Sequence, residues 1–262
     1  MGNPSATLRA SLAIGALVTG AVTSNVVLAN PSSADTTTSI SPPITTPYVA
    51  PLASTSATTL PRNHPLLRLG SKGSAVRDLQ HRLSTLGYWL GPIDGLFGNL
   101  TQQAVYALQK ASSLARDGVV GVQTYAALAR SVRPDPRSKT GNAVEIDLRR
   151  NLLMIVRGGQ LATTLNTSTG GGYAFTSGGV TSIANTPRGV FAIFRQVDGM
   201  DTSPLGELWR PKYFTGGFAI HGSASVPPYP VSHGCVRLSN AAMDWIWATN
   251  RMPIGARVWV YQ

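Results

Sequence analysis

Cysteine and acidic residues are scarce in this chain of 262 residues. Its one cysteine, Cys235, excludes an intramolecular disulfide, and the lack of cysteine near the N-terminus excludes a lipid anchor on a cysteine there. Only 11 acidic residues accompany 22 lysines and arginines, so the formal net charge is +11. A basic surface indicates an anionic partner. Nucleic acid, wall polymers and lipid surfaces all qualify, and charge alone does not choose among them.

Long hydrophobic runs are also rare. One apolar stretch, residues 12–22, follows Arg9 and is followed in turn by small residues that end at Ala29. This pattern predicts a secretory signal peptide at residues 1–29, with an uncleaved membrane anchor as the alternative. We therefore expect export to the periplasm or cell wall, with no stable membrane insertion after cleavage. A lone thiol is a hazard in an exported protein unless it has a function, so Cys235 is expected to be reactive.

The region after the signal segment changes composition twice. Residues 30–63 are rich in Ser, Thr and Pro with almost no charge, which predicts a disordered tether. Residues 64–132 then carry a helical pattern, beginning with a helix that Ser74 caps and that ends before Gly87. The expected inward side chains of this helix are Val76, Leu79, Leu83 and Leu86.

An internal repeat follows that helix. Residues 94–101 and 117–124 both read D-G-x-x-G-x-x-T. In each copy we expect the Asp to bond the local backbone, a Gly to adopt positive φ, and Thr101 or Thr124 to cap a helix. Residues 64–132 are therefore predicted to form a small three-helix module.

The periodicity changes beyond a Pro-containing linker at residues 133–141. Alternating apolar residues at 144–148, an apolar run at 152–156 and a Gly-Gly turn at 158–159 predict paired strands. Further strands are expected near residues 161–169, 190–194, 218–221 and 257–261, and a helix is expected after Ser239 or Asn240. With only 13% charged residues and many glycines, residues 142–262 are predicted to form a mostly β domain.

Two of the four histidines lie close to the cysteine in sequence. The segment Ser232-His233-Gly234-Cys235 follows His221-Gly222 after a short gap. A histidine can take the proton of a thiol and activate it as a nucleophile, and Gly222 and Gly234 allow close approach of a substrate. Backbone N–H groups near Cys235 could stabilise an oxyanion. Two alternatives stay open: a zinc site formed by His221, His233 and Cys235, and a structural cysteine with incidental histidines.

The helical segment resembles a known family, the three-helix peptidoglycan-binding domain. The resemblance rests on the two D-G-x-x-G-x-x-T turns and on the motifs Leu69-Gly70-Ser71-Lys72-Gly73, Val76, Leu79-Gln80 and Leu86-Gly87-Tyr88. One departure is Leu108, where the family usually has an aromatic residue. The resemblance implies a helical fold and peptidoglycan as the partner.

Residues 142–262 resemble the L,D-transpeptidase catalytic domain, also called the YkuD domain. The matching motifs are Thr186-Pro187-x-Gly189, Ile220-His221-Gly222 and Ser232-His233-Gly234-Cys235-Val236-Arg237-Leu238. The resemblance implies that Cys235 is the nucleophile, that a carbonyl near Gly222 orients His221 as its base, and that His233 lies beside the substrate. It also implies that Gly234 and Cys235 supply oxyanion donors.

Two further residues of the motif, Arg237 and Ser232, are expected to bind substrate or to shape the site. Arg237 suits a bidentate contact with a substrate carboxylate, and a structural salt bridge is the alternative. Ser232 is expected to shape the site by hydrogen bonding. Among aromatic residues, Trp209, Tyr213 and Tyr229 are candidates for lining the cleft. Residues 200–209 and 223–231 lack periodicity and are expected to be cleft loops or a lid.

The resemblance implies an acyl transfer on peptidoglycan stem peptides through a thioester, by a monomer, without a metal or organic cofactor. Alternatives are an L,D-carboxypeptidase, an enzyme that attaches a protein to the wall by the same chemistry, and a catalytically silent wall-binding protein. Nucleic acid is set aside as a partner because export is predicted. His64 and His81 are expected to be solvated.

Overall fold

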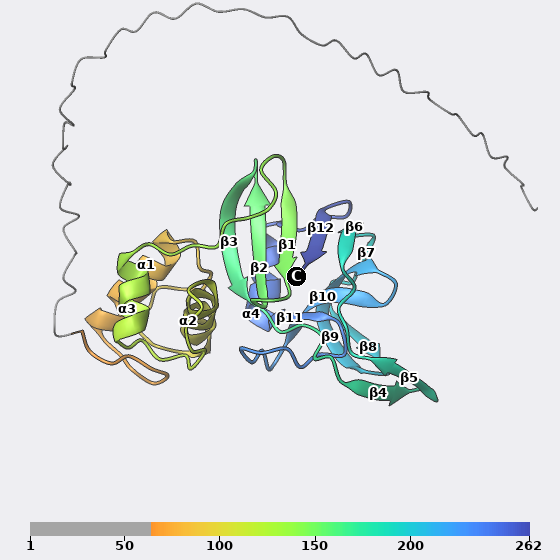
Figure 1. Ribbon diagram of the computed structural model, residues 1–262, viewed down its shortest axis with the longest axis horizontal. Coiled ribbons are helices and arrows are strands. Elements are labelled where there is room, and N and C mark those ends of the chain that lie inside the picture. Colours follow the sequence, from red (N-terminus) through yellow and green to blue (C-terminus); the bar gives the residue numbers. More distant parts are fainter. Residues whose placement is uncertain (1–63) are drawn as a thin grey trace, which may run out of the picture. The chain divides into compact units, whose positions relative to one another are not determined.

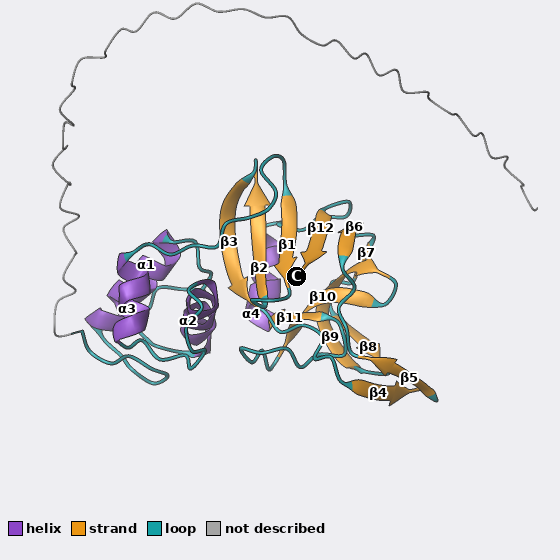
Figure 2. Ribbon diagram, in the orientation of Figure 1, coloured by secondary structure: helices purple, strands orange, loops and turns teal. Residues whose placement is uncertain are grey.

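Three helices and a β-rich region follow one another in the computed structural model, which describes residues 64–262 (Figure 1). The predicted signal peptide at 1–29 and tether at 30–63 lie outside the described residues. Within residues 64–262, no helix has the length and apolar character that a membrane span requires. The fold class agrees with the prediction, because helices come first and strands with one late helix follow (Figure 2).

The helical module packs α1 (Ser74–Thr85), α2 (Asn99–Ala111) and α3 (Val122–Ala129) around one apolar core. Leu108, at the position where an aromatic residue was expected from the resemblance, is fully buried in this core. Gly87 has φ +82 just past α1, as a residue that ends a helix often does.

The predicted helix starts need correction. The residue that caps α1 is Gly73 and not Ser74, and α2 and α3 begin after Gly98 and Gly121, so Thr101 and Thr124 are already inside their helices. The two threonine hydroxyls donate to loop carbonyls and accept from a glutamine amide, which explains why they are buried.

The repeat is built around two buried glutamines. The Gln80 amide nitrogen donates to Asp94, to the Leu96 carbonyl and to Thr101, while its oxygen accepts from the Gly95 N–H. Gln109 makes the same set of contacts with the second copy, through Asp117, Gly118, Val119 and Thr124. Each D-G turn is therefore fixed from a neighbouring helix as well as by its own aspartate.

Two sheets form the β region. The first has the order β3-β2-β1-β12-β6, and the second has the order β11-β10-β9-β7 with β8 also paired to β9. Their bounds are β1 (Ala143–Asp147), β2 (Leu152–Arg157), β3 (Gln160–Asn166), β6 (Gly189–Ala192), β7 (Arg195–Gln196), β8 (Met200–Ser203), β9 (Gly206–Thr215), β10 (Phe218–Ser223), β11 (Val236–Ser239) and β12 (Arg257–Tyr261). A separate hairpin joins β4 (Ala174–Ser177) to β5 (Val180–Ile183).

The late helix, α4 (Asn240–Ala248), follows β11 directly. The Ser239 side chain accepts from the Ala242 N–H, so one of the two predicted caps is the one used. Met243 and Ile246 of this helix join a core with Ile146 of the first sheet and Ile220 of the second. This shared core holds β10 and β11 side by side.

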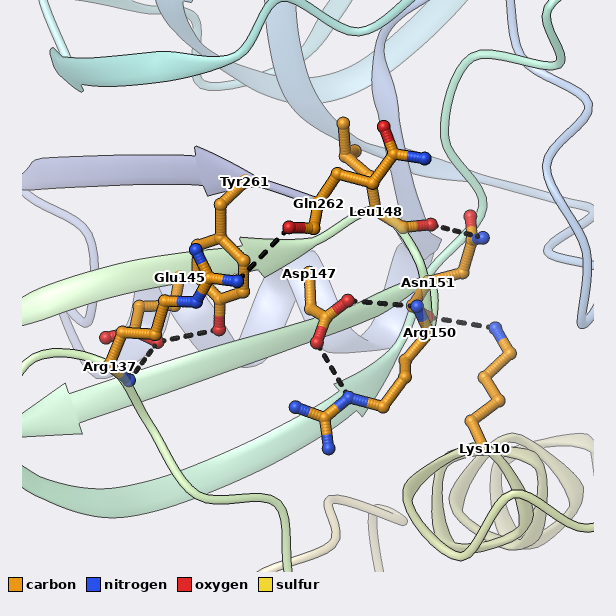
Figure 3. A network of polar contacts seen from close by, with 9 residues as sticks. All are labelled: Lys110, Arg137, Glu145, Asp147, Leu148, Arg150, Asn151, Tyr261 and Gln262. Carbon is orange, nitrogen blue, oxygen red and sulfur yellow. Dashed lines mark hydrogen bonds and ion pairs between the residues drawn. The ribbon is translucent and has the colours of Figure 1, made fainter.

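Residues 133–141 are bound to the β region. Glu145, fully buried on β1, accepts from the Arg137 N–H and from the Tyr261 hydroxyl (Figure 3). It also accepts from the Ser138 N–H. The helical module also contacts the first sheet, because the Trp89 N–H donates to the Thr164 carbonyl and Leu152 of β2 packs in the helical core. Residues 64–262 accordingly belong to one compact unit.

Candidate active site

A cavity of about 580 Å³ opens at the end of β10 and β11. Five residues of the predicted site line it: His221, Ser232, His233, Cys235 and Arg237. The hairpins β4–β5 and β8–β9 supply most of the remaining wall, which is mainly apolar. The strands place the two motifs together because β10 and β11 run parallel, with His221 paired to Arg237 in register.

His221 is held in one tautomer. Its side chain is 5% exposed, and Nδ1 lies 2.8 Å from the Gly222 carbonyl oxygen. A carbonyl can only accept, so Nδ1 carries the hydrogen and Nε2 has a lone pair available. Burial lowers the pKa of His221 to about 4, and the positive charge of Arg237 acts in the same direction against the Gly222 hydrogen bond. The imidazole is therefore neutral at neutral pH.

Cys235 precedes β11 and is half-buried. Its Sγ lies 3.8 Å from the Gly217 carbonyl oxygen. Burial raises the pKa of the thiol, and a hydrogen bond from the Ala219 backbone and the charge of Arg237 oppose that rise. Together with the neutral His221, this favours a resting site in which both side chains are uncharged.

Hydrogen bonds of the Ser232 side chain stabilise the turn that leads to Cys235. The Ser232 hydroxyl accepts from the Gly234 N–H at 3.1 Å and donates to the Cys235 carbonyl, which agrees with the shaping role expected for Ser232. Gly234 has φ +133, and an added Cβ would lie 2.5 Å from a ring carbon of Phe218, so a larger residue does not fit. Because its N–H is already bonded, the oxyanion role predicted for Gly234 requires that this bond be exchanged for one to the substrate.

Gly222 does not line the cavity, which corrects the expectation that it leaves room for a substrate. An added Cβ there would lie 2.8 Å from a Trp209 ring carbon and 2.7 Å from the Asn240 side chain. Close packing inside the domain therefore explains this glycine. Its functional contact is the carbonyl that fixes His221.

Comparison with known proteins matches two segments of the chain to known families. Residues 72–128 match the family model of a peptidoglycan binding domain, and residues 141–260 match the L,D-transpeptidase catalytic domain (YkuD). A crystal structure of an L,D-transpeptidase from Xylanimonas cellulosilytica is 52% identical, covers 77% of this chain and 100% of its own, and has a TM-score of 0.74. The chain belongs to the L,D-transpeptidase family.

Two curated relatives match about a quarter of this chain or less. An N-acetylmuramoyl-L-alanine amidase, CwlL of Bacillus licheniformis, is 46% identical over 66 residues, which is 24% of this chain and 18% of that protein. CwlM of Mycobacterium tuberculosis, also named N-acetylmuramoyl-L-alanine amidase, is 41% identical over 56 residues, or 21% of this chain and 14% of that protein. The chain thus spans less than a fifth of either relative.

Arg237 of the L,D-transpeptidase domain has a guanidinium that forms no ion pair with any of residues 64–262, so the salt-bridge alternative is not observed there. Its backbone is fixed, because its N–H donates to the Ser168 carbonyl at 2.9 Å. The ring of His233 packs edge-on against Phe175 of β4, with centroids 4.8 Å apart. Both side chains thus border the cavity without a charged protein partner among the described residues.

Of the other residues considered for the site, only Tyr213 lines the cavity. Tyr213 lines the cavity and donates from its hydroxyl to Asp201, but Trp209 instead donates to Asp244, and neither it nor Tyr229 is part of the lining. His64 stacks on Tyr125 outside the site, and His81 is exposed. In the described part of the chain, no three His, Cys, Asp or Glu side chains group as metal ligands, so the zinc alternative has no geometric basis there.

Two hairpins of the cavity wall were missed at the sequence level. Residues 200–209, expected to be a loop, form β8 and the start of β9, although they do border the cleft. The β4–β5 hairpin contributes Phe175 and Ile183 to the lining. Gly178-Gly179 between β-branched and aromatic residues was the available signal for that hairpin.

Proposed function

We propose that this protein is an L,D-transpeptidase that acts on peptidoglycan stem peptides through a thioester on Cys235. One observation carries the proposal: Cys235 and His221 line the same cavity, and the Gly222 carbonyl holds His221 so that Nε2 can accept a proton. A neutral thiol and a neutral imidazole on the wall of one cavity suit base-assisted attack, in which the proton moves as the carbon–sulfur bond forms.

The reaction proceeds in two halves. The Cys235 proton passes to Nε2 of His221 while Sγ bonds to the carbonyl carbon of the third residue of a tetrapeptide stem. The bond to the terminal D-alanine breaks, and the imidazolium gives its proton to the departing amine, which leaves a thioester. A side-chain amine of a second stem then attacks the thioester and gives a proton to His221, and that proton returns to Sγ as the carbon–sulfur bond breaks.

The cavity supports recognition of a peptide that ends in a carboxylate. Arg237 borders it with a guanidinium that no described acidic residue neutralises, and guanidinium geometry matches a carboxylate bidentately. Phe175, Leu208 and Phe218 supply apolar wall for the body of the peptide. Arg237 also favours a thiolate in the transition state, since its charge lowers the pKa of Cys235.

The helical module is proposed to retain the enzyme on the wall, in agreement with its family match at residues 72–128. A substrate of this kind places the enzyme outside the cytoplasm, in the periplasm or cell wall. Water in place of the acceptor amine would make the same site an L,D-carboxypeptidase. A protein amine would make it a wall-attachment enzyme.

The test is intact-mass spectrometry of the protein, produced without residues 1–29, after incubation with a carbapenem. We expect a covalent adduct on the wild type, none on Cys235→Ala and a much slower reaction on His221→Ala. A tetrapeptide stem with and without an acceptor stem then separates crosslinking from hydrolysis. An adduct on Cys235→Ala, or crosslinking by that variant, would overturn the mechanism.

No adduct on either protein would favour a wall-binding protein that is catalytically silent. Labelling with a small alkylating reagent provides the control for access. If the reagent modifies Cys235 and the carbapenem does not, the thiol is reachable but the site lacks transpeptidase chemistry.

A further inference from the structure

Residues 224–231 connect the strand that carries His221 to the turn that carries Cys235, and they have no helix or strand of their own. Side chains from other segments hold the backbone carbonyls of this connection. The Val226 carbonyl accepts from Gln103 Nε2 at 3.1 Å, and the Pro228 carbonyl accepts from Arg116 Nη1 at 3.1 Å. The Tyr229 carbonyl accepts from Ser168 Oγ at 2.8 Å.

Two of these donors belong to the helical module. Gln103 lies on α2, is 9% exposed, and accepts from Asn166 Nδ2 of β3 at 2.6 Å, so its amide bridges β3 and the 224–231 connection. Arg116 lies just beyond α2 and is half-buried. A binding module that only retained the enzyme on the wall would have no need of these contacts.

A second set of hydrogen bonds links α2 to the start of β11, which follows Cys235. Lys110 Nζ, on α2, donates to the Thr167 carbonyl at 2.9 Å. Thr167 Oγ1 in turn donates to the Arg237 carbonyl at 2.8 Å, and the Arg237 N–H donates to Ser168. Helix α2 thus makes hydrogen bonds to Thr167, beside β11, and to residues 224–231, which lead into the Ser232–Cys235 turn.

We propose that α2 and the segment after it are a positioning element of the active site, acting through Gln103 and Arg116 on residues 224–231. By fixing this connection, they set the placement of Cys235 relative to His221. The module then has a role in the chemical step besides wall retention. This inference rests on the proposed function, because it concerns the geometry of the same thiol.

The test uses the protein without residues 1–29 and compares Gln103→Ala and Arg116→Ala with matched controls. Gln123→Ala and Arg130→Ala change the same residue types at exposed positions of the module. The rate of carbapenem acylation is measured against carbapenem concentration, which separates the maximal rate from the half-saturating concentration. Thermal unfolding of each variant is recorded alongside.

We expect the maximal acylation rate to fall about tenfold in Gln103→Ala and Arg116→Ala, because a small displacement of a reacting group is costly. The half-saturating concentration should change by less than about twofold, since neither residue lines the cavity. Arg116→Lys keeps a charged donor and should recover most of the rate. A general loss of stability would lower the folded fraction and would not be rescued in this way.

Failure of the inference is distinguishable from failure of the proposed function. If the wild type reacts and both variants match the controls in maximal rate, the positioning role is wrong and the transpeptidase proposal stands. If the wild type itself forms no adduct, the proposed function fails first. A lower rate explained wholly by the unfolded fraction would also overturn the inference.

Discussion

Lys110 allows a quantitative test of the contact between the helical module and the β domain. Its side chain is 1% exposed, and Nζ donates to the Asn151 carbonyl at 2.9 Å (Figure 3). Nζ also donates to the Thr167 carbonyl at 2.9 Å. No acidic side chain among the described residues pairs with it. Burial, and then the positive charge of Arg116, hold the pKa of Lys110 well below its ordinary value.

The sign of the pH dependence follows from that shift. Between the lowered pKa in the folded state and about 10.4 in the unfolded chain, the unfolded state binds more protons, so stability rises with pH. Each unit of depression contributes about 1.4 kcal/mol over this window. Lys110→Met fills a similar volume, removes the titration and removes both Lys110 hydrogen bonds. The buried Thr167 carbonyl then lacks the Lys110 donor, at about 1–3 kcal/mol, whereas the Asn151 carbonyl keeps the Thr167 N–H at 3.3 Å. Its cost should therefore be largest at alkaline pH and shrink as the pH falls.

Urea unfolding of wild type and Lys110→Met at about pH 6 and about pH 9 measures this difference. We expect a loss of about 2–4 kcal/mol at the higher pH and a clearly smaller loss at the lower pH. Lys139→Met is the matched control, because the Lys139 side chain is 64% exposed and pairs with an exposed Asp135. An equal cost of Lys110→Met at both pH values would refute the argument that burial depresses this pKa.

Three further predictions concern the site and the repeat. Since the folded-state pKa of His221 is about 4, the rate of carbapenem acylation should fall only as the pH drops through about 4, where Nε2 becomes protonated. Arg237→Gln should raise the half-saturating concentration of a stem peptide with a free carboxylate about tenfold, with little effect on its amidated form. Gln80→Leu should lower stability by about 3 kcal/mol in urea unfolding, because it removes several buried hydrogen bonds, whereas Gln123→Leu should change little.

The predictions for His221, Arg237 and Gln80 would each be contradicted by a specific result. An acid limb near the ordinary histidine pKa of about 6.5 would mean that burial does not control His221. Equal effects of Arg237→Gln on free and amidated peptides would assign that arginine to the fold rather than to the carboxylate. Equal costs at residues 80 and 123 would mean that the repeat does not depend on its buried amides.

Local pattern predicted the kinds of most elements, but it missed the β4–β5 and β8–β9 hairpins and misplaced the helix starts. The apolar spacing of α1 reflects burial of one face, which periodicity records directly. Alternation also predicted β1, but all five of its residues are buried, and its polar residues Glu145 and Asp147 accept hydrogen bonds there. The placement of Thr101 as a cap was wrong because its hydroxyl is committed to Leu96 and Gln80. A partner 21 residues away on another helix leaves no mark on the local sequence.

The sequence predicted the catalytic residues of the site better than it predicted the contacts that hold them in place. Cys235 and His221 stand in a short motif, and parallel pairing of β10 with β11 brings their strands together. The contact of Gln103 with Val226 joins residues 123 positions apart, and a glutamine inside an amphipathic helix gives no sign of such a partner. Gly222 illustrates the opposite error, because its small size serves packing against Trp209 rather than access for a substrate.

The contact between the helical module and the β domain also limits which variants can be used to test retention on the cell wall. Trp89 and Gly87 pair with Thr164 through the backbone, and Leu152 of β2 is buried in the helical core. Hydrogen bonds of this kind contribute about 1 kcal/mol net, so these two alone would hold a separated state to about one part in thirty. A fragment that begins near residue 142 would expose Leu152 and lose the contacts of Gln103 and Lys110. Weaker retention of this fragment on walls would therefore reflect damage to the β domain as well as loss of binding by the module. Retention should be measured instead with surface substitutions in a protein that keeps the contact between the module and the β domain.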